Sequence, residues 1–332
     1  MNRFSHIIIQ SLIVLLGFAL CILFYFYSIG AFQSPAAVGY IHSPKELPYL
    51  DLDALKTTFS QESVPFYEAD SSLSYAQAAD YLIQQGAQVL IVNQDTDTID
   101  SDLLQIANEN GTTLLFVGRA PSDDALSSYD KAWYIGSSSA LGGELLGYQL
   151  ALAFRDGTIV DSNGDHLLQY SFYLSNNGPY YQELASHTME ECEHYGVFSD
   201  QIQYVSENGE ALEFTAEQLA GQPKPEALLC STTQDARMLH DLAAQLGWLD
   251  GDAPVRIAAI AQNPTDAQAL IADGICFAVS YYNPTAIAQT VADFALNSLM
   301  QEYAAQNIEL QPDESGHFFV PFELITSLES QN

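Results

Sequence analysis

The sequence predicts an α/β fold of two lobes, each a parallel β-sheet with helices on both faces. Short apolar runs alternate with segments that carry apolar residues at helical spacing, from Val38 to near the end of the chain. This alternation is typical of repeated strand–helix–strand units. At 332 residues the chain is too long for one ordinary domain and suits two units of about 150 residues. A hydrophobic fraction of 48% is enough for a substantial core.

The clearest strand–helix–strand unit follows residue 85. Val89 to Val92 is an apolar run that ends in polar residues, the first of which is Asn93. Apolar residues then recur at helical spacing from Ile99, Gly111 ends this predicted helix, and Leu114 to Val117 is a second apolar run. Ligands of open parallel sheets bind at the carboxyl ends of strands. Asn93 is therefore the first candidate for a ligand contact.

The charge of the chain limits its partners. The formal net charge is −33, with 9 Lys and Arg residues against 42 Asp and Glu residues. Such a surface repels nucleic acid and anionic ligands, so it favours a neutral or cationic small molecule. An acidic surface that serves only solubility is the alternative interpretation.

The cysteines give no support for metal or redox chemistry. Cys21 lies in the apolar N-terminus, while Cys192, Cys230 and Cys276 lie in the remainder of the chain. No CxxC or CxxH spacing occurs among them. Buried inert thiols are expected, with one disulfide as the alternative in an oxidising compartment.

The N-terminus predicts a membrane anchor. Ile7 to Ile29 is almost entirely apolar, and a bilayer span needs about 20 such residues. Arg3 precedes the run and the next basic residue is Lys45, which orients the N-terminus inward. We therefore expect residues 1–30 to form one transmembrane helix, followed by a linker at 31–36, with the body on the extracytoplasmic face of the membrane. Cleavage as a signal sequence would instead release a secreted protein.

A longer stretch carries a family resemblance. The sequence RAPSDDALSSYDKAWYIGSSS from Arg119 to Ser139 follows Gln-Gly-Ala, the strand LIVN and a helix that ends at Gly111, and it precedes a helix at Ala140 to Phe154. These features resemble the sugar-binding proteins of the type I periplasmic binding protein family, most closely the glucose/galactose-binding branch. More loosely, the resemblance extends from Val38 to the C-terminus.

The resemblance implies two Rossmann-like lobes joined by a three-segment hinge that closes on a ligand. It places the crossings between lobes near Val117, Tyr281 and Asp313. The N-terminal lobe would then comprise 37–117 and 282–313, and the C-terminal lobe 118–281 and 314–332. The last strand, expected at Phe318 to Ile325, should cross between the lobes.

The family's ligand positions nominate a set of contacts in this sequence. In it, Tyr49 would stack on a sugar ring, Tyr180, Tyr181 or Tyr282 could stack or donate hydrogen bonds, and amides or hydroxyls would pair with sugar hydroxyls. The full set is Tyr49, Asn93, Tyr180, Tyr181, Thr232, Gln262, Tyr282 and Asn283. Tyr49 could equally pack on the predicted helix Leu50 to Phe59.

The sequence also departs from the family at this site. Pro179, Tyr181 and Ala185 stand where the relatives have a histidine, an aspartate and an arginine, and Leu47 replaces a carboxylate. These departures argue against glucose or galactose itself. Tyr180 and Tyr181 could also fill a site that has lost its ligand.

A second motif resembles the family's calcium loop. Asp161, Asn163 and Asp165 alternate along the chain, as oxygen ligands do in the first half of a calcium loop. The resemblance implies a structural Ca2+ held by Asp161, Asn163, Asp165, the Leu167 carbonyl, Gln169 and Glu226. His166 replaces the usual glycine at the sharp turn. The alternative is a polar turn without a metal.

These observations favour a binding protein over an enzyme. No G-x-S-x-G, H-E-x-x-H or Walker sequence occurs, and the seven histidines are scattered. We expect an extracytoplasmic protein that captures a neutral monosaccharide or glycoside for an ABC transporter. The alternatives are an anchored sensor subunit that signals to a histidine kinase, and a diverged member that no longer binds sugar.

Overall fold

The computed structural model describes residues 36–43, 50–175, 178–206, 214–300 and 310–327, together with Leu16, Phe18, Leu20, Gln306 and Ile308. Apart from those first three single residues, the expected anchor at residues 1–30 lies outside the described chain, and so does Tyr49. Within the described residues, no helix has the length and apolar character needed to cross a bilayer.

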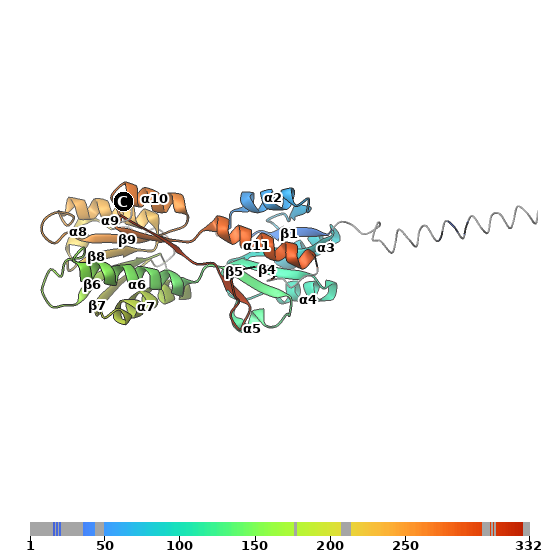
Figure 1. Cartoon of the computed structure of the whole chain (residues 1–332), viewed down its shortest axis with the longest axis horizontal. Helices are drawn as coiled ribbons and strands as arrows, with labels where there is room; N and C mark the ends of the chain where they lie inside the picture. Colours follow the sequence, from blue (N-terminus) through green and yellow to red (C-terminus); the bar gives the residue numbers. More distant parts are fainter. Residues whose placement is uncertain are drawn as a thin grey trace, which may run out of the picture.

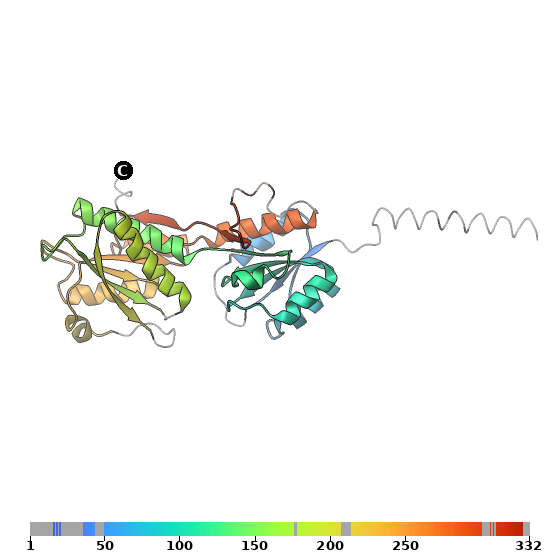
Figure 2. The ribbon, with the colours of Figure 1, turned by 90° about the horizontal axis from the view of Figure 1, so that it is seen from below.

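Two six-stranded sheets form two lobes that lie side by side along the long axis (Figures 1 and 2). The first sheet has the order β11-β5-β4-β3-β1-β2. Its strands are β1 Ala37–Ile41, β2 Phe66–Glu68, β3 Ala87–Gln94, β4 Thr113–Gly118, β5 Ala132–Gly136 and β11 His317–Phe319. The second sheet has the order β12-β10-β9-β8-β6-β7. Its strands are β6 Leu168–Leu174, β7 Ser199–Val205, β8 Ala227–Cys230, β9 Arg256–Ala261, β10 Ala278–Tyr281 and β12 Glu323–Thr326. All pairings are parallel except that of β12 with β10.

Helices cover the faces of both sheets (Figure 1). The first lobe carries α2 Leu52–Gln61, α3 Tyr75–Gln84, α4 Ser101–Asn110, α5 Asp123–Leu126 and α11 Pro284–Leu299. The second carries α6 Ser139–Asp156, α7 Pro179–His194, α8 Ala216–Ala220, α9 Thr233–Gln245 and α10 Pro264–Ala272. Fold class and strand–helix alternation are thus as the sequence predicts.

The unit β3–α4–β4 confirms the strand, helix and second strand that the sequence predicts after residue 85. The Asp100 side chain accepts hydrogen bonds from the first-turn N–H groups of α4, as an N-cap does. Gly111 ends the helix in the left-handed conformation with φ 65°. Asn93 lies at the carboxyl end of β3, where the sequence places it.

The boundaries between the lobes differ from those expected. Strand β5 pairs with β4 and β11, so residues 118–136 belong to the first lobe and the first crossing follows Gly136. The second crossing lies at residues 282–283, close to the expected one at Tyr281, since α11 packs on the first lobe. The expected last strand is two strands, β11 in the first sheet and β12 in the second. Pro321 lies between them, and proline cannot donate to a strand ladder.

The crossings meet around one aromatic side chain. The Phe322 ring lies 6.0 Å from the Tyr282 ring in an edge-on contact. A Cβ added at Gly142, in the first turns of α6, would lie 3.1 Å from the same Phe322 ring. Because α6 follows the first crossing, Phe322 joins all three crossings in one buried cluster. We call Phe322, Tyr282 and Gly142 the hinge cluster.

Helices α6 and α7 pack closely through glycines on one face of the second sheet (Figure 2). A Cβ at Gly143 would lie 2.5 Å from the Leu184 carbonyl oxygen, and one at Gly147 would lie 2.4 Å from that of Thr188. Cys192 donates its thiol proton to the Gly147 carbonyl oxygen at 3.3 Å. The three described cysteines are free and buried, in agreement with the expectation of inert thiols.

Candidate functional site

Both sheets turn their carboxyl ends toward the hinge. The first crossing leaves from the end of β5 and the second from the end of β10. Since parallel strands share one direction, the ends of β3 and β4 lie at the hinge edge of the first lobe, and those of β6, β8 and β9 at the hinge edge of the second. Polar side chains gather at both edges.

Asn93 anchors the edge of the first lobe. It is buried, its Nδ2 donates to Tyr40 Oη at 3.1 Å, and its backbone oxygen accepts from Tyr75 Oη at 3.1 Å. Among the described residues, its Oδ1 is a buried acceptor without a hydrogen-bond partner. An unpaired buried acceptor costs about 1–3 kcal/mol. A ligand donor at this oxygen would offset that cost.

A glycine at the end of the neighbouring strand leaves room beside this amide. Gly118 ends β4 with φ 88°, and a Cβ there would lie 2.7 Å from Asn93 Oδ1. The next residue, Arg119, is half-buried and forms no salt bridge within the described chain, although the protein is strongly acidic. Arg119 is not among the contacts selected from the sequence. Its position two residues after the predicted strand Leu114 to Val117 was the available signal.

Hydroxyl groups form the edge of the second lobe. The Ser231 hydroxyl lies 2.9 Å from both the backbone N–H and the hydroxyl oxygen of Ser175. Thr232 donates to Asp235 Oδ2 at 2.7 Å and accepts from the Asp235 N–H at 3.1 Å, as the N-cap of α9. Ser175 and Ser231 are 56 residues apart in sequence, so no local pattern could pair them.

Two tyrosines open the helix that follows Ser175, and the second of them reaches the Ser175 hydroxyl. Tyr180 and Tyr181 open α7, with ring centroids 5.1 Å apart in an edge-on contact. Burial raises the pKa of Tyr181, against a hydrogen bond with Ser175 that lowers it, and the Asp235 carboxylate raises it further. The Tyr181 phenol therefore stays neutral and lies with the hydroxyl group of Ser175. Gln262 follows β9 and is exposed.

Tyr282 and Asn283 are engaged in the hinge. Tyr282 is buried in the hinge cluster. Asn283 caps α11 through its Oδ1, which accepts from the Ala286 N–H at 3.1 Å, and its Nδ2 donates to Glu323 Oε1 at 2.8 Å. Tyr281 Oη donates to the other oxygen of Glu323 at 2.5 Å. These hydrogen bonds connect the second crossing to β12, the strand that follows the third crossing. Tyr282 and Asn283 therefore have a structural role that the sequence did not reveal.

The loop before β6 brings the expected calcium residues together. Asn163 Nδ2 donates to Asp165 Oδ2 at 2.9 Å, and Gln169 Nε2 donates to both oxygens of Asp165 at 2.9 and 3.1 Å. Glu226 reaches the loop from 57 residues away, accepting from the Gln169 N–H at 3.2 Å and from the Ser162 N–H at 2.7 Å. Burial raises the pKa of Glu226, although these N–H groups lower it.

His166 occupies the sharp turn of this loop, where the family's calcium loop usually has a glycine. His166 adopts φ 66°, the left-handed conformation that the usual glycine would take. Its backbone N–H donates to Asp161 Oδ2 at 3.0 Å, and the Leu167 N–H donates to Asp165 Oδ1 at 2.8 Å. In the described part of the chain, no group of three or more His, Cys, Asp and Glu side chains is arranged to hold a metal. The carboxylates of the loop are separated by the amides of Asn163 and Gln169, whose oxygens are also potential calcium ligands.

Comparisons with known proteins agree with this architecture. Residues 55–302 match a family model described as periplasmic binding protein domain. An ABC transporter periplasmic solute binding protein from Actinobacillus succinogenes 130z, solved with bound D-allose, shares 14% identity and a TM-score of 0.64, over 90% of this chain and 99% of that one. A glucose-galactose binding protein from Geobacillus stearothermophilus shares 12% identity and a TM-score of 0.57, over 89% and 99%. A chain of the XylFII-LytSN complex shares 11% identity and a TM-score of 0.58, over 89% and 98%. At these identities the solved structures establish similarity of fold.

Proposed function

This chain belongs to the periplasmic binding protein family, and from that premise we propose that it captures a neutral monosaccharide or glycoside outside the cytoplasm for an ABC transporter. The two lobes would close on the ligand by a hinge motion at the three crossings. The expected anchor at residues 1–30 would hold the body at the extracytoplasmic face of the membrane.

The observation that carries this proposal is the unpaired Asn93 Oδ1 at the hinge edge of the first lobe. A sugar hydroxyl donates one hydrogen bond and accepts others. It therefore suits a site in which Asn93 offers an acceptor and the Ser175, Ser231 and Tyr181 hydroxyls lie at the opposing edge. Tyr180 and Tyr181 add ring surface for stacking. The similarity to proteins solved with D-allose, or described as binding glucose and galactose, supports the same ligand class.

A thermal-shift screen of neutral monosaccharides, followed by titration calorimetry, tests this proposal. We expect at least one hexose or pentose to raise the unfolding temperature. Asn93→Ala should weaken its binding by about 10-fold, the equivalent of one lost hydrogen bond at a buried site. The exposed Asn108→Ala is the matched control and should bind as wild type does. No stabilisation by any neutral sugar at millimolar concentration would contradict the proposal and favour a member that has lost its ligand.

We also propose that the loop at residues 161–169 binds a structural Ca2+ with Glu226. Two observations support this proposal. Oxygen atoms that can bind calcium are gathered in the loop, and the backbone of His166 adopts the left-handed conformation that the sharp turn requires. Calcium at 100 times its dissociation constant should stabilise the fold by about 2.7 kcal/mol. Asp165→Asn should abolish this effect in a calcium-titrated thermal melt, whereas the exposed Asp252→Asn should keep it. A melting temperature that calcium leaves unchanged in the wild type would favour a plain polar turn.

A sensor subunit is the second candidate. The observation that favours it is the similarity to a chain of the XylFII-LytSN complex, in which a protein of this fold is assembled with another protein. Such a subunit would present the sugar-bound state to a membrane sensor kinase instead of a permease. Copurification with the products of neighbouring genes, with and without sugar, separates the two: a permease as partner supports transport, and a histidine kinase supports sensing.

A further inference from the structure

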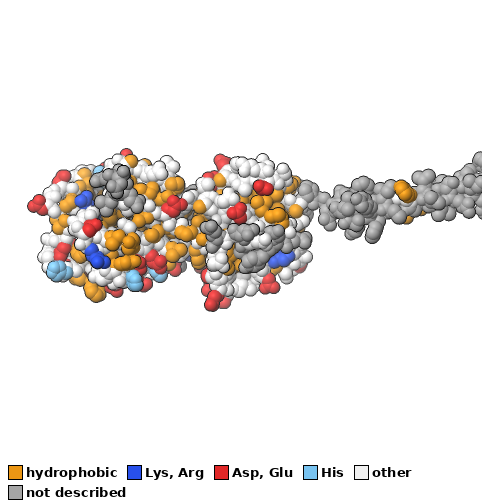
Figure 3. Space-filling view, viewed as in Figure 1, with side chains coloured by type: hydrophobic (Ala, Val, Ile, Leu, Met, Phe, Trp, Pro, Cys, Tyr) orange, Lys and Arg blue, Asp and Glu red, His pale blue; other side chains and the backbone are white. Residues whose placement is uncertain are grey.

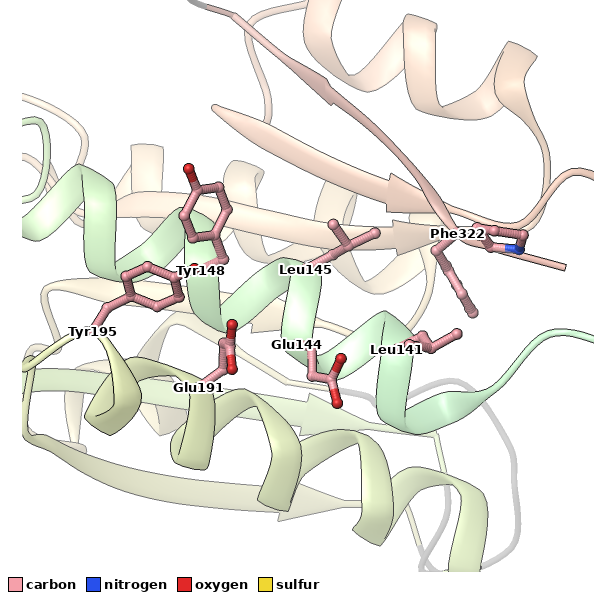
Figure 4. A pocket seen from close by; sticks show the side chains of 8 residues that line it. Leu141, Glu144, Leu145, Tyr148, Glu191, Tyr195 and Phe322 are labelled. Carbon is pink, nitrogen blue, oxygen red and sulfur yellow. The ribbon is translucent and has the colours of Figure 1, made fainter. Parts of the chain in front are cut away.

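A groove lies on the outer side of α6, beside the third crossing. It has a volume of about 300 Å³ and is lined by Leu141, Glu144, Leu145 and Tyr148 from α6, Glu191 and Tyr195 at the end of α7, and Pro321 and Phe322 from the crossing (Figure 4). In the surface view, hydrophobic side chains gather over α6 with acidic side chains beside them (Figure 3). Ligand pockets begin at about this volume. Its residues take no part in the sugar site proposed above.

The aromatic side of the groove presents two tyrosine rings. Tyr148 and Tyr195 lie with ring centroids 4.9 Å apart at 58° to one another. Leu145 lies next to them along α6, and the hinge-cluster residue Phe322 closes the far end (Figure 4). Tyrosine faces carry the negative part of the ring quadrupole and attract cations.

The polar side of the groove is acidic. Glu191 packs against the backbone of α6 at Gly147, because a Cβ added at Gly147 would lie 2.8 Å from Glu191 Cβ. Glu191 forms no salt bridge with any described residue. The Nδ1 atom of His187 lies 3.6 Å from Glu144 Oε1. No Lys or Arg lines the groove. Two carboxylates, two tyrosine rings and apolar side chains thus line one groove in a protein with a net charge of −33.

We propose that this groove binds a small organic cation, an amine or guanidinium group carried on an apolar body such as an aromatic ring. The carboxylates of Glu144 and Glu191 pair with the charged group, the tyrosine faces stack against it, and Leu141, Leu145 and Phe322 cover the apolar body. A neutral analogue loses the charged contacts, and an anion is repelled.

Titration with benzylamine, monitored by NMR, tests the site. Benzyl alcohol is the neutral analogue and phenylacetate the anionic one. We expect benzylamine to bind about 5-fold more tightly than benzyl alcohol, with shifts at Tyr148 and Tyr195, and phenylacetate not to bind. Equal binding of amine and alcohol would overturn the proposal.

Charge variants separate the groove from general attraction to an acidic protein. The double variant Glu144→Gln with Glu191→Gln should lose the preference for benzylamine. The double variant Glu62→Gln with Glu109→Gln, at exposed positions of the first lobe, makes the same change of net charge and should keep it. Equal effects of the two double variants would overturn the proposal. A lysine peptide serves as a cationic probe without an aromatic body, and its binding to the groove in the absence of benzylamine binding would overturn the proposal as well. Sugar is absent from these experiments, so their outcome is independent of the sugar site.

Discussion

Asp313 shows how one side chain fastens the approach to the hinge. Its Oδ1 accepts from the backbone N–H groups of Ser315 and His317, each at 2.9 Å, and the His317 imidazole Nδ1 lies 3.0 Å from its Oδ2. His317 is buried, and its Nε2 lies 3.1 Å from the Pro121 carbonyl oxygen. This network holds β11 against the end of the first lobe, directly before the third crossing.

The network predicts a loss of stability in acid. Burial raises the pKa of Asp313, but the His317 N–H, its imidazole and the Ser315 N–H together outweigh that effect, so the net shift is downward. A depressed pKa contributes stability above the pKa of the unfolded chain, near 3.9, and this contribution is lost as the pH falls through the folded pKa. Asp313→Asn should cost about 1 kcal/mol near pH 7, since the carboxylate is partly exposed, and progressively less as the pH falls below the pKa of the unfolded chain. Urea unfolding of both proteins across this range measures it; a cost that does not change with pH would contradict the account.

Polar residues after strands explain why the site was only partly predictable. Thr232, Asn263 and Asn283 each follow a strand of the second sheet and cap the next helix. The same residue types at the same places bind ligands in open α/β sheets. Sequence alone cannot separate the two roles, because the distinction depends on whether the side chain turns to its own helix. Asn93 was identifiable because no helix begins directly after it.

At the scale of elements, the regular strand–helix units could be predicted and the exceptions could not. β3, α4 and β4 carry clear periodicity, a cap and a stop glycine. β5 follows a loop with one short helix, so nothing local assigns it to either lobe, and its pairing with β11 joins segments far apart in the sequence. The break at Pro321 was visible as a proline inside the expected strand, and it now marks the third crossing.

The packing of α6 on α7 supplies a prediction at this scale. Gly147→Ala would place its Cβ 2.4 Å from the Thr188 carbonyl oxygen, and backbone on both sides leaves little room to adjust. We expect it to destabilise the fold by about 1–3 kcal/mol through overpacking. Gly221→Ala, with φ −74° and its nearest atom at 3.5 Å, is the control and should be neutral or slightly stabilising. Thermal or urea unfolding compares them, and equal stabilities would show that the helices can separate at no cost.

At the scale of the molecule, the three crossings between the lobes are joined to one another. Phe322 packs on Gly142 and Tyr282, and Glu323 receives hydrogen bonds from Tyr281 and Asn283. Hydrogen bonds from these side chains lower the pKa of Glu323, while burial raises the pKa of Tyr281 to about 12, helped by Glu323. The crossings are therefore fastened to one another, so the lobes are expected to move as rigid bodies about them.

Small-angle X-ray scattering tests the central claim, that two lobes close on a neutral sugar, most directly. The protein would be measured alone and with a saturating amount of the sugar that binds most tightly in the monosaccharide screen, with Asn93→Ala under the same conditions as the control. Closure predicts a smaller radius of gyration for the wild type with sugar, and the same decrease for Asn93→Ala only at about 10-fold higher sugar concentration. A wild-type radius of gyration that saturating sugar leaves unchanged would contradict the account.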